Sequence, residues 1–199
     1  MIDREHFFTT VRAGLFHGSL EQPQVDGMNI ILDAFETRAV PRDHQAYPLA
    51  TAYHETAFTM QPIDEIGSYA YFERNYGPTG RNPKRAKEMG NVRAGDGARY
   101  HGRGFVQCTW FVNYNRATKE LGVDFVNHPE LAKEPQHAAD IMILGMTEGW
   151  FTGRKLGDFF SATMERPVQA RTIINGTDKA ETIAGYYRIF KNALSPPSS

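Results

Sequence analysis

Residues 48–62 read PLATAYHETAFTMQP, and their pattern predicts the helix that carries Glu55. Its apolar and small residues recur at about 100° per residue and predict a helix from Pro48 to Met60. The residues on that face are Leu49, Ala52, Tyr53, Thr56 and Met60. Pro62 ends the pattern, because proline interrupts a helix.

Glu55 lies about 120° from the centre of this apolar face when the helical pitch is applied to the sequence. A carboxylate at such a position can face a cleft while its helix is anchored in the core. The pattern alone favours an ordinary solvated surface carboxylate, so other features must decide between the two.

The segment that follows is rich in glycine and proline. Residues 61–104 predict a long irregular excursion between helices. A loop of this length inside a compact domain is unusual unless it has a function. We therefore expect the chemistry of the protein to border this segment.

Helical patterning dominates both ends of the chain and resumes after the irregular segment. Apolar stripes with three- and four-residue spacing predict four further helices. They run through Val25–Phe35, Trp110–Leu121 before Gly122, Ala138–Met146 after Pro135, and Ile183–Leu194. Capping boxes are predicted at Ser19–Gln22 and Asp178–Glu181, and Thr109 is a candidate N-cap of the helix that follows it.

The charge balance argues against a nucleic-acid partner. The 199 residues include 22 Lys and Arg and 23 Asp and Glu, a formal charge of −1, whereas phosphate-binding proteins need a basic surplus. No apolar run approaches the roughly 18–20 residues that span a bilayer, so no stable membrane association is expected. The start, Met1–His6, is polar and acidic, unlike a secretory signal.

No metal ion or other cofactor is expected. His54 and Glu55 begin like the helix of zinc proteases, but Phe58 stands where the second histidine is required. Cys108 is the single cysteine, which excludes an internal disulfide and a cysteine zinc site. It follows His101 and precedes a predicted helix, yet a lone cysteine here fits a small core residue better than a nucleophile.

Paired carboxylates fit the pattern better. Hydrolysis of a glycosidic bond needs one carboxylic acid to protonate the leaving oxygen and a second carboxylate to activate water or attack carbon. Glu55 ends an anchored helix, and Asp64, Glu65 and Glu73 lie just beyond it. Aromatic residues suited to sugar faces, and equally to core packing, are Tyr69, Tyr71, Phe72, Tyr76, Tyr100 and Trp110.

Several short segments form a family pattern. They are Ala52–Thr56, Tyr100–Trp110, Asn113–Tyr114, Leu121–Asp124, His128–Leu131 and Ile173–Gly176. The first resembles the His-Glu-Thr signature of glycoside hydrolase family 19, and the second resembles that family's Tyr-x-Gly-Arg-Gly-x-x-Gln-Leu-Ser/Thr run. The others continue in the family's order, so the resemblance covers residues 48–176. Several motifs in one order are far more specific than any one alone.

Within this family the chain is similar to phage and prophage endolysins, which cut peptidoglycan. Its compact length, Thr56–Pro62 and Phe151–Leu156 resemble that branch. Plant chitinases of the family carry several disulfides, which a chain with one cysteine cannot form. Cys108 departs from the family's usual leucine, but it is a small apolar replacement. The resemblance implies a mainly α, lysozyme-like, two-lobed helical domain with a long irregular loop bordering a substrate cleft.

The resemblance also implies roles for individual residues. Glu55 matches the general acid, and Glu65, in a Pro-x-x-Glu segment of the phage type, matches the base, with Glu73 as the alternative. Thr109 matches the hydroxyl that holds the nucleophilic water. Residues expected to contact substrate or organise the cleft are Gln107, Asn113, Tyr100, Arg103, Asn175 and Glu73. Arg103, between two glycines, equally suits a structural role in which it pairs with an acid.

Together these features predict a monomeric endolysin that hydrolyses the β-1,4 glycan of peptidoglycan by inversion. The alternatives are a chitinase acting on β-1,4-linked N-acetylglucosamine and an inactive chitinase-like glycan-binding protein, which the intact Glu55 and Thr109 argue against. We expect one catalytic domain over residues 1–194 and a disordered tail over 195–199. The protein is expected to accumulate in the host cytoplasm and to reach the wall through a holin pore. Since the net charge is near zero, affinity for the wall is expected to come from the cleft.

Overall fold

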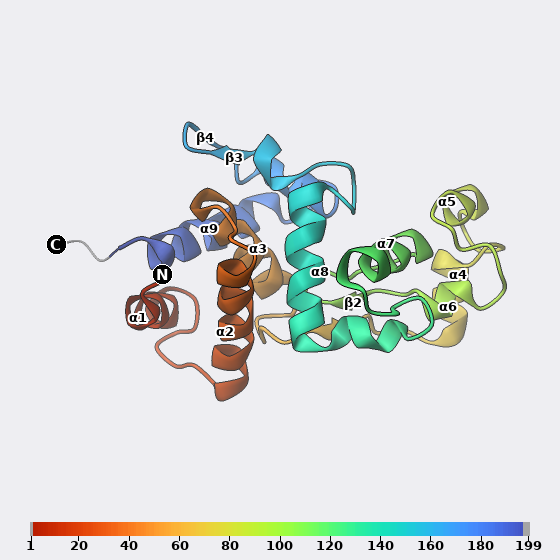
Figure 1. Ribbon diagram of the computed structural model, residues 1–199, viewed down its shortest axis with the longest axis horizontal. Helices are drawn as coiled ribbons and strands as arrows, with labels where there is room; N and C mark the ends of the chain where they lie inside the picture. The colour runs from red at the N-terminus through yellow and green to blue at the C-terminus, as the bar shows by residue number, and fades with distance from the viewer. Residues whose placement is uncertain (1, 197–199) are drawn as a thin grey trace. The chain divides into compact units, whose positions relative to one another are not determined.

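The computed structural model describes residues 2–196, in which the chain divides into two compact units. The first unit comprises the residues up to Gln61 and those from Met142 onward, and the second comprises Pro62–Ile141. Helices predominate in both units, which confirms the expected mainly α fold (Figure 1). Of the tail predicted to be disordered, residues 197–199 lie outside the described part of the chain.

The first unit is built from long helices. Its elements are α1 (Arg4–Gly14), α2 (Gln22–Thr37), α3 (Arg42–Glu55), η2 (Leu156–Asp158), β3 (Phe160–Ser161), β4 (Met164–Glu165), η3 (Gln169–Ile173) and α9 (Ala180–Leu194). α9 packs against both α1 and α3, and the rings of Phe7 and Phe190 stack with centroids 6.2 Å apart. α8 (Pro135–Glu148) begins in the second unit and ends in the first. Over residues 2–196, no helix is long and apolar enough to cross a membrane.

Helix α3 differs from the prediction in both its ends and its environment. It begins at Arg42 rather than Pro48, carries Pro48 in its interior, and ends at Glu55 rather than near Met60. All residues from Gln45 to Tyr53 are buried, so the helix has core on every side rather than one apolar face. A helix that is buried all round lacks the one-sided periodicity from which its start can be predicted.

The helix termini also differ from the predicted caps. The capping box at the start of α2 joins Glu21 and Gln24, not Ser19 and Gln22. At the start of α9 the cap is Lys179, with φ 58° and no side-chain hydrogen bond, so the box predicted at Asp178 is absent there.

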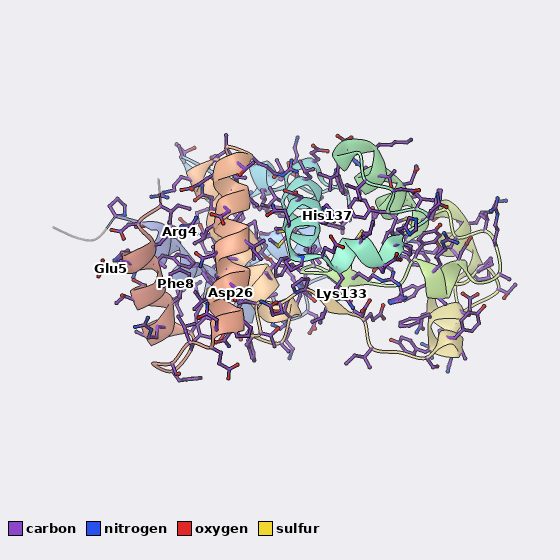
Figure 2. The ribbon with its side chains drawn as sticks, turned by 60° about the horizontal axis from the view of Figure 1, so that its bottom comes forward. Arg4, Glu5, Phe8, Asp26, Lys133 and His137 are labelled. Carbon is purple, nitrogen blue, oxygen red and sulfur yellow. The ribbon has the colours of Figure 1, made fainter. Side chains whose placement is uncertain are left out.

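The first helix, α1, was not predicted as a separate element. The Asp3 side chain caps it by accepting a hydrogen bond from the His6 amide. Arg4 reaches from α1 towards α2 (Figure 2). There it donates to Asn29 Oδ1 (2.6 Å) and pairs with Asp33 (2.5 Å). This contact fixes the two N-terminal helices to each other.

The second unit is made of short elements. They are β1 (Ile63–Asp64), α4 (Tyr69–Tyr76), α5 (Pro83–Glu88), α6 (Asp96–Arg99), β2 (Arg103–Gly104), α7 (Phe111–Leu121) and η1 (Pro129–Lys133). The segment expected to be irregular therefore contains three short helices. Ser68 and Asn82 cap α4 and α5 with their side chains. β1 and β2 pair antiparallel, with Ile63 opposite Gly104, which closes residues 61–104 into a loop with joined ends.

Candidate active site

The first unit fixes Glu55 at the end of a buried helix. Glu55 is the last residue of α3, and Thr56 is its C-cap. The buried Thr56 hydroxyl donates to the Ala52 carbonyl (2.8 Å) and accepts from the Met60 amide (3.0 Å). The threonine of the His-Glu-Thr signature therefore holds the turn that follows the carboxylate.

This turn has a strained backbone and packs closely against α2 at Met60. Ala57, Phe58 and Met60 all have left-handed backbone, with φ of 49°, 70° and 54°. A Cβ at Gly27 would lie 1.7 Å from the Met60 carbonyl oxygen, so only glycine lets α2 approach the turn. Non-glycine residues in this region each cost about 1–3 kcal/mol and persist where the surrounding packing imposes them, often at functional sites.

Arg171 is the direct partner of Glu55. Its Nη1 lies 2.6 Å from Glu55 Oε1, and its Nε donates to the Asp178 carbonyl at 3.0 Å. The side chains of Arg171 and Glu55 are 5% and 19% exposed. A largely desolvated, charge-assisted hydrogen bond fixes the orientation of the carboxylate. Nothing in the local sequence indicates Arg171 as this partner, since it lies 116 residues from Glu55 along the chain.

Two further polar groups near Glu55 were also missed. The Tyr47 hydroxyl and His54 Nδ1 are buried and have no hydrogen-bond partner among the described residues. Burial raises the pKa of Tyr47, an effect that the Arg171 charge opposes and the Glu55 charge reinforces. Burial also lowers the pKa of His54. Both side chains are therefore favoured in their neutral forms beside the ion pair.

Asn175 lies in the same unit, on the segment that follows η3. Its side chain is exposed, and its Oδ1 accepts from the Gly176 amide at 2.9 Å. The backbone amide of Asn175 donates to the Arg171 carbonyl at 3.1 Å. Asn175 is thus joined through the backbone to the residue that holds Glu55.

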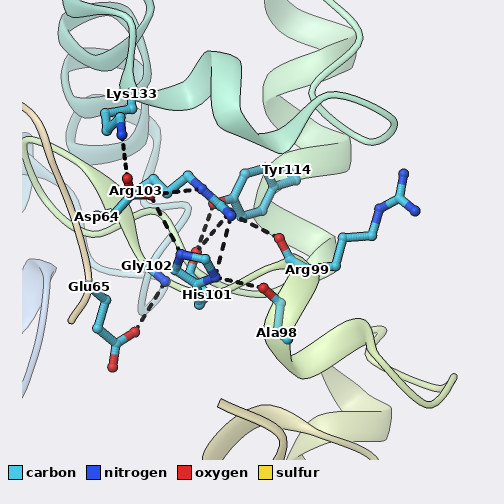
Figure 3. Close-up of polar contacts among 9 residues, drawn as sticks. All are labelled: Asp64, Glu65, Ala98, Arg99, His101, Gly102, Arg103, Tyr114 and Lys133. Atoms are coloured by element: carbon cyan, nitrogen blue, oxygen red, sulfur yellow. Dashed lines mark hydrogen bonds and ion pairs between the residues drawn. The ribbon is translucent and has the colours of Figure 1, made fainter. Parts of the chain in front are cut away.

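Glu65 belongs to the second unit, where two donors hold it. The Gly102 amide donates to Glu65 Oε2 at 3.2 Å (Figure 3). Tyr76 Oη donates to Glu65 Oε1 at 2.8 Å. Burial, followed by the Glu65 hydrogen bond and charge, raises the pKa of Tyr76, so the phenol stays neutral and donates. This fixes the carboxylate while leaving lone pairs free to accept further hydrogen bonds.

Gln107 lies beside Glu65, with a strained backbone and a side-chain amide that lacks hydrogen-bond partners. Its φ is 55°, and both amide atoms of its side chain are buried without a hydrogen-bond partner among the residues described. A Cβ at Gly102 would lie 2.5 Å from Gln107 Oε1 and 3.2 Å from Glu65 Oε2, so glycine makes room for both groups. Buried polar groups are normally hydrogen-bonded, and this exception points to a ligand or water at the position.

Thr109 is not the N-cap that the sequence suggested. Helix α7 begins at Phe111, and its cap is Trp110, whose φ is 77°. The Thr109 hydroxyl instead donates to the Gln107 carbonyl at 2.9 Å, so its oxygen can still accept from a water. Asn113 donates to the Thr109 carbonyl at 2.8 Å, and its buried Oδ1 has no partner in the described part of the chain.

Arg103 joins segments of the second unit through side-chain contacts. It is buried, and its Nε lies 3.1 Å from Asp64 Oδ1, while its Nη1 donates to Tyr114 Oη at 2.8 Å (Figure 3). Lys133 also pairs with Asp64. Burial alone would raise the pKa of Asp64, but Lys133, Arg103 and His101 together lower it. Of the two predicted roles for Arg103, the geometry supports the structural one.

Glu73 and Tyr100 are likewise committed to internal contacts. Glu73 Oε2 accepts from the Gly95 amide (3.1 Å) and Oε1 from the Ala98 amide (2.8 Å), which holds α6 against α4. Tyr100 is 5% exposed, and its hydroxyl donates to the Val126 carbonyl at 3.2 Å. The predicted substrate contacts of these two side chains find no support in this geometry.

The sequence of the chain matches the model of a known family. The family model described as chitinase class I, of glycoside hydrolase family 19, matches residues 34–155. The chain belongs to glycoside hydrolase family 19. The matched range includes Glu55, Glu65, Gln107, Thr109 and Asn113.

Two plant proteins show the family relationship in sequence. A basic endochitinase of Vitis vinifera is 42% identical over 55 residues, which is 28% of this chain and 16% of that protein. Endochitinase A2 of Pisum sativum is 38% identical over 55 residues, or 15% of its length. The match therefore covers about one sixth of the length of each relative.

Solved structures show the relationship in fold. Chitinase C from Streptomyces griseus HUT6037 has a TM-score of 0.57 at 20% identity, covering 97% of this chain and 76% of that one. A bacterial family 19 chitinase has a TM-score of 0.52 at 20% identity, covering 100% and 97%. These similarities confirm the lysozyme-like helical fold expected for a member of family 19.

Proposed function

We propose that the protein is a glycosidase in which Glu55 is the general acid. The observation that carries this proposal is the pairing of Glu55 with the buried Arg171 at the end of α3, in a chain of glycoside hydrolase family 19. Glu55 gives its proton to the leaving oxygen as the glycosidic bond breaks. Arg171 then stabilises the carboxylate that remains and keeps it aimed at the same point.

Glu65 is the proposed base of the same reaction. It takes a proton from the attacking water, and Tyr76 and the Gly102 amide hold it in place. The Thr109 oxygen accepts a hydrogen bond from that water, and Gln107 and Asn113 supply unsatisfied amide groups for the sugar. Direct attack by water inverts the anomeric centre. Glu65 lies beside the buried, unpartnered side-chain amide of Gln107, and this position favours Glu65 over Glu73 as the base.

The proposed substrate is bacterial peptidoglycan, in the role of a monomeric phage endolysin. The chain's single cysteine and its phage-type segments Thr56–Pro62 and Phe151–Leu156 support this branch. In this role the protein would collect in the host cytoplasm and reach the wall through a holin pore. A chitinase is the second candidate, because the family model and both plant relatives are named for chitin hydrolysis. An inactive glycan-binding protein is disfavoured by the intact set of Glu55, Glu65 and Thr109.

A parallel assay separates these candidates. Lysis of chloroform-treated Gram-negative cells, followed by turbidity, is measured beside release of reducing sugar from colloidal chitin. An endolysin clears the cells and acts weakly on chitin. The reverse preference would make the protein a chitinase, and no turnover on either polymer would favour a binding role.

A further inference from the structure

Positive and negative residues are unevenly distributed along the chain, although its net charge is near zero. Residues 74–99 hold seven of the 22 Lys and Arg residues but only two of the 23 Asp and Glu residues. This segment therefore has a formal charge of +5, and the remainder of the chain has −6, which together give the net −1. A net charge near zero for the whole chain does not determine the electrostatic field around such a segment.

All seven cations of this segment are exposed. They are Arg74, Arg81, Lys84, Arg85, Lys87, Arg93 and Arg99, named below as the basic face. None of them enters an ion pair with another described residue. Arg81 donates to the Asn75 side chain and Arg99 to the Val126 and Asn127 carbonyls, which are neutral partners. The full positive charge of the face is thus presented to solvent.

The two acids of the segment lower its formal charge from +7 to +5. Asp96 is half-buried, and its Oδ2 accepts from the Val92 and Arg93 amides at 2.8 and 2.7 Å. Its carboxylate therefore shapes the loop before α6. Glu88 is the one exposed acid of residues 74–99.

Backbone contacts hold the basic face together within the second unit. The Arg81 amide donates to the Arg74 carbonyl at 2.7 Å, and the Asn91 amide donates to the Ala86 carbonyl at 2.9 Å. Helices α4, α5 and α6 lie together in this unit (Figure 1). Arg93 and Arg99 line a hollow of ≈ 680 Å³ together with the exposed ring of Tyr69.

The basic face is also tied to the proposed base. Helix α4 ends at Tyr76, whose hydroxyl donates to Glu65, and Arg74 lies two residues before it. Glu65 and the basic face thus belong to the same compact unit, Pro62–Ile141. Cations spread over residues 74–99 suit a polymer that carries negative charge along its length.

We propose that the basic face binds the carboxylates of the peptides attached to peptidoglycan, and so selects an anionic wall glycan over neutral chitin. This inference rests on the proposed function. Peptidoglycan carries short peptides with ionised carboxylates at neutral pH, whereas chitin has no charge for seven cations to meet. Exposed ion pairs are individually weak, so the effect depends on several cations acting along one polymer. It adds an electrostatic contribution to affinity beyond that of the sugar-binding residues.

Sedimentation with purified Gram-negative sacculi tests the proposal without requiring turnover. All proteins carry Glu55→Gln, so that the polymer stays intact. The test variant combines Lys84→Gln, Arg85→Gln and Lys87→Gln, and the matched control combines Arg12→Gln, Arg166→Gln and Arg188→Gln. The control removes three exposed cations of the first unit and changes the net charge equally. A charge-retaining variant, Lys84→Arg with Lys87→Arg, and thermal unfolding check that the fold is preserved.

We expect the test variant to bind sacculi about tenfold more weakly, the lower end of what a focused field contributes to association. The control and the charge-retaining variant should change binding less than about twofold, as expected for isolated surface charges. Raising salt from about 50 to 300 mM should weaken the parent and largely spare the test variant, because screening acts on exposed charges. Binding to colloidal chitin should be the same for all.

Three outcomes would overturn the assignment. Equal losses in the test variant and the control would show an effect of net charge alone. Equal losses on sacculi and chitin would show that the face does not discriminate by charge. Displacement from sacculi by duplex DNA, but not by soluble wall peptides, would make it a general polyanion surface. The proposed glycosidase activity is tested separately, by release of reducing ends from sacculi with the Glu55-containing protein, so its failure is distinguishable.

Discussion

Arg171 Nη1 lies 2.6 Å from Glu55 Oε1, and this contact joins the end of α3 to a segment 116 residues further along the chain. Both side chains are largely removed from solvent. Removing one partner of a buried ion pair leaves the other charge uncompensated, at a cost of about 3–5 kcal/mol. The pair therefore fixes a carboxylate that has to meet the leaving oxygen in one orientation.

Arg171→Lys tests the positioning role of this pair. Lysine keeps the charge but loses the planar fork that contacts both Glu55 and the Asp178 carbonyl. We expect kcat on chitohexaose to fall about 10- to 100-fold with little change in KM, the range of effects of misaligned catalytic groups. Arg171→Gln should lose more activity and also lower the unfolding temperature. Equal kcat in wild type and Arg171→Lys would show that the guanidinium does not position the acid.

Glu65→Gln and Glu73→Gln distinguish the two candidates for the base. We expect Glu65→Gln to lower kcat about 10²–10⁴-fold, the scale of general base catalysis, with the fold intact. Glu73→Gln keeps one acceptor oxygen for the two amides of Gly95 and Ala98, so it should mainly lower the unfolding temperature. Kinetics and thermal unfolding of both variants check this. The opposite pattern would transfer the catalytic role to Glu73.

Thr109→Val tests whether a hydroxyl holds the attacking water, with Thr109→Ser as the matched control. Valine is isosteric but cannot accept a hydrogen bond, so the rate should fall while the fold persists. The lost bond to the Gln107 carbonyl is worth only about 1 kcal/mol of stability. Serine keeps the hydroxyl and should retain most of the rate. Similar rates in the two variants would remove Thr109 from the reaction.

The stereochemistry of the product gives a separate test of direct attack by water. Inversion of a β-linked glycan yields the α-anomer first, whereas a covalent sugar ester yields the β-anomer. Proton NMR of the new reducing end, recorded before mutarotation, should show the α-anomer. Early appearance of the β-anomer would assign the second carboxylate the role of nucleophile.

Asp64→Asn tests the framework around Arg103, with Glu120→Gln, an exposed carboxylate of α7, as the control. We expect a loss of about 2 kcal/mol at pH 7, less than for a fully buried pair because Asp64 is 39% exposed. The lowered pKa of Asp64 stabilises the fold above the carboxyl's unfolded pKa, and this is lost as pH falls through the folded value. The difference from wild type should therefore shrink below about pH 4. A difference independent of pH would show that the charge of Asp64 is not what matters.

The sequence predicted those elements whose burial is one-sided. The stripe from Val25 to Phe35 lies within α2, and Pro135 begins α8 as expected. The start of α3 was wrong because that helix is buried all round. The cap at Thr109 was wrong because Trp110 takes a left-handed conformation that no local pattern indicates.

The candidate site was predictable only in part, for a related reason. Motif spacing singled out Glu55, Glu65, Thr109 and Gln107, and a structural pairing of Arg103 with an acid was one of two predicted roles. The identity of that acid, Asp64, and the partner of Glu55 depend on chain segments that meet only in the folded state. Likewise, the basic face is hidden in the net charge and appears only when charge is counted by segment.

Glu55→Gln is the most direct test of whether Glu55 is the general acid. Glutamine keeps the shape of the side chain but cannot donate an acidic proton, and Glu181→Gln, an exposed carboxylate of α9, is the control. Release of reducing ends from purified sacculi and from chitohexaose is measured at equal concentrations of folded protein. We expect a loss of roughly 10²–10⁴-fold on whichever glycan the wild type hydrolyses, the scale of general acid catalysis, and no loss in the control. Near-normal hydrolysis by folded Glu55→Gln would contradict the assignment of Glu55 as the general acid.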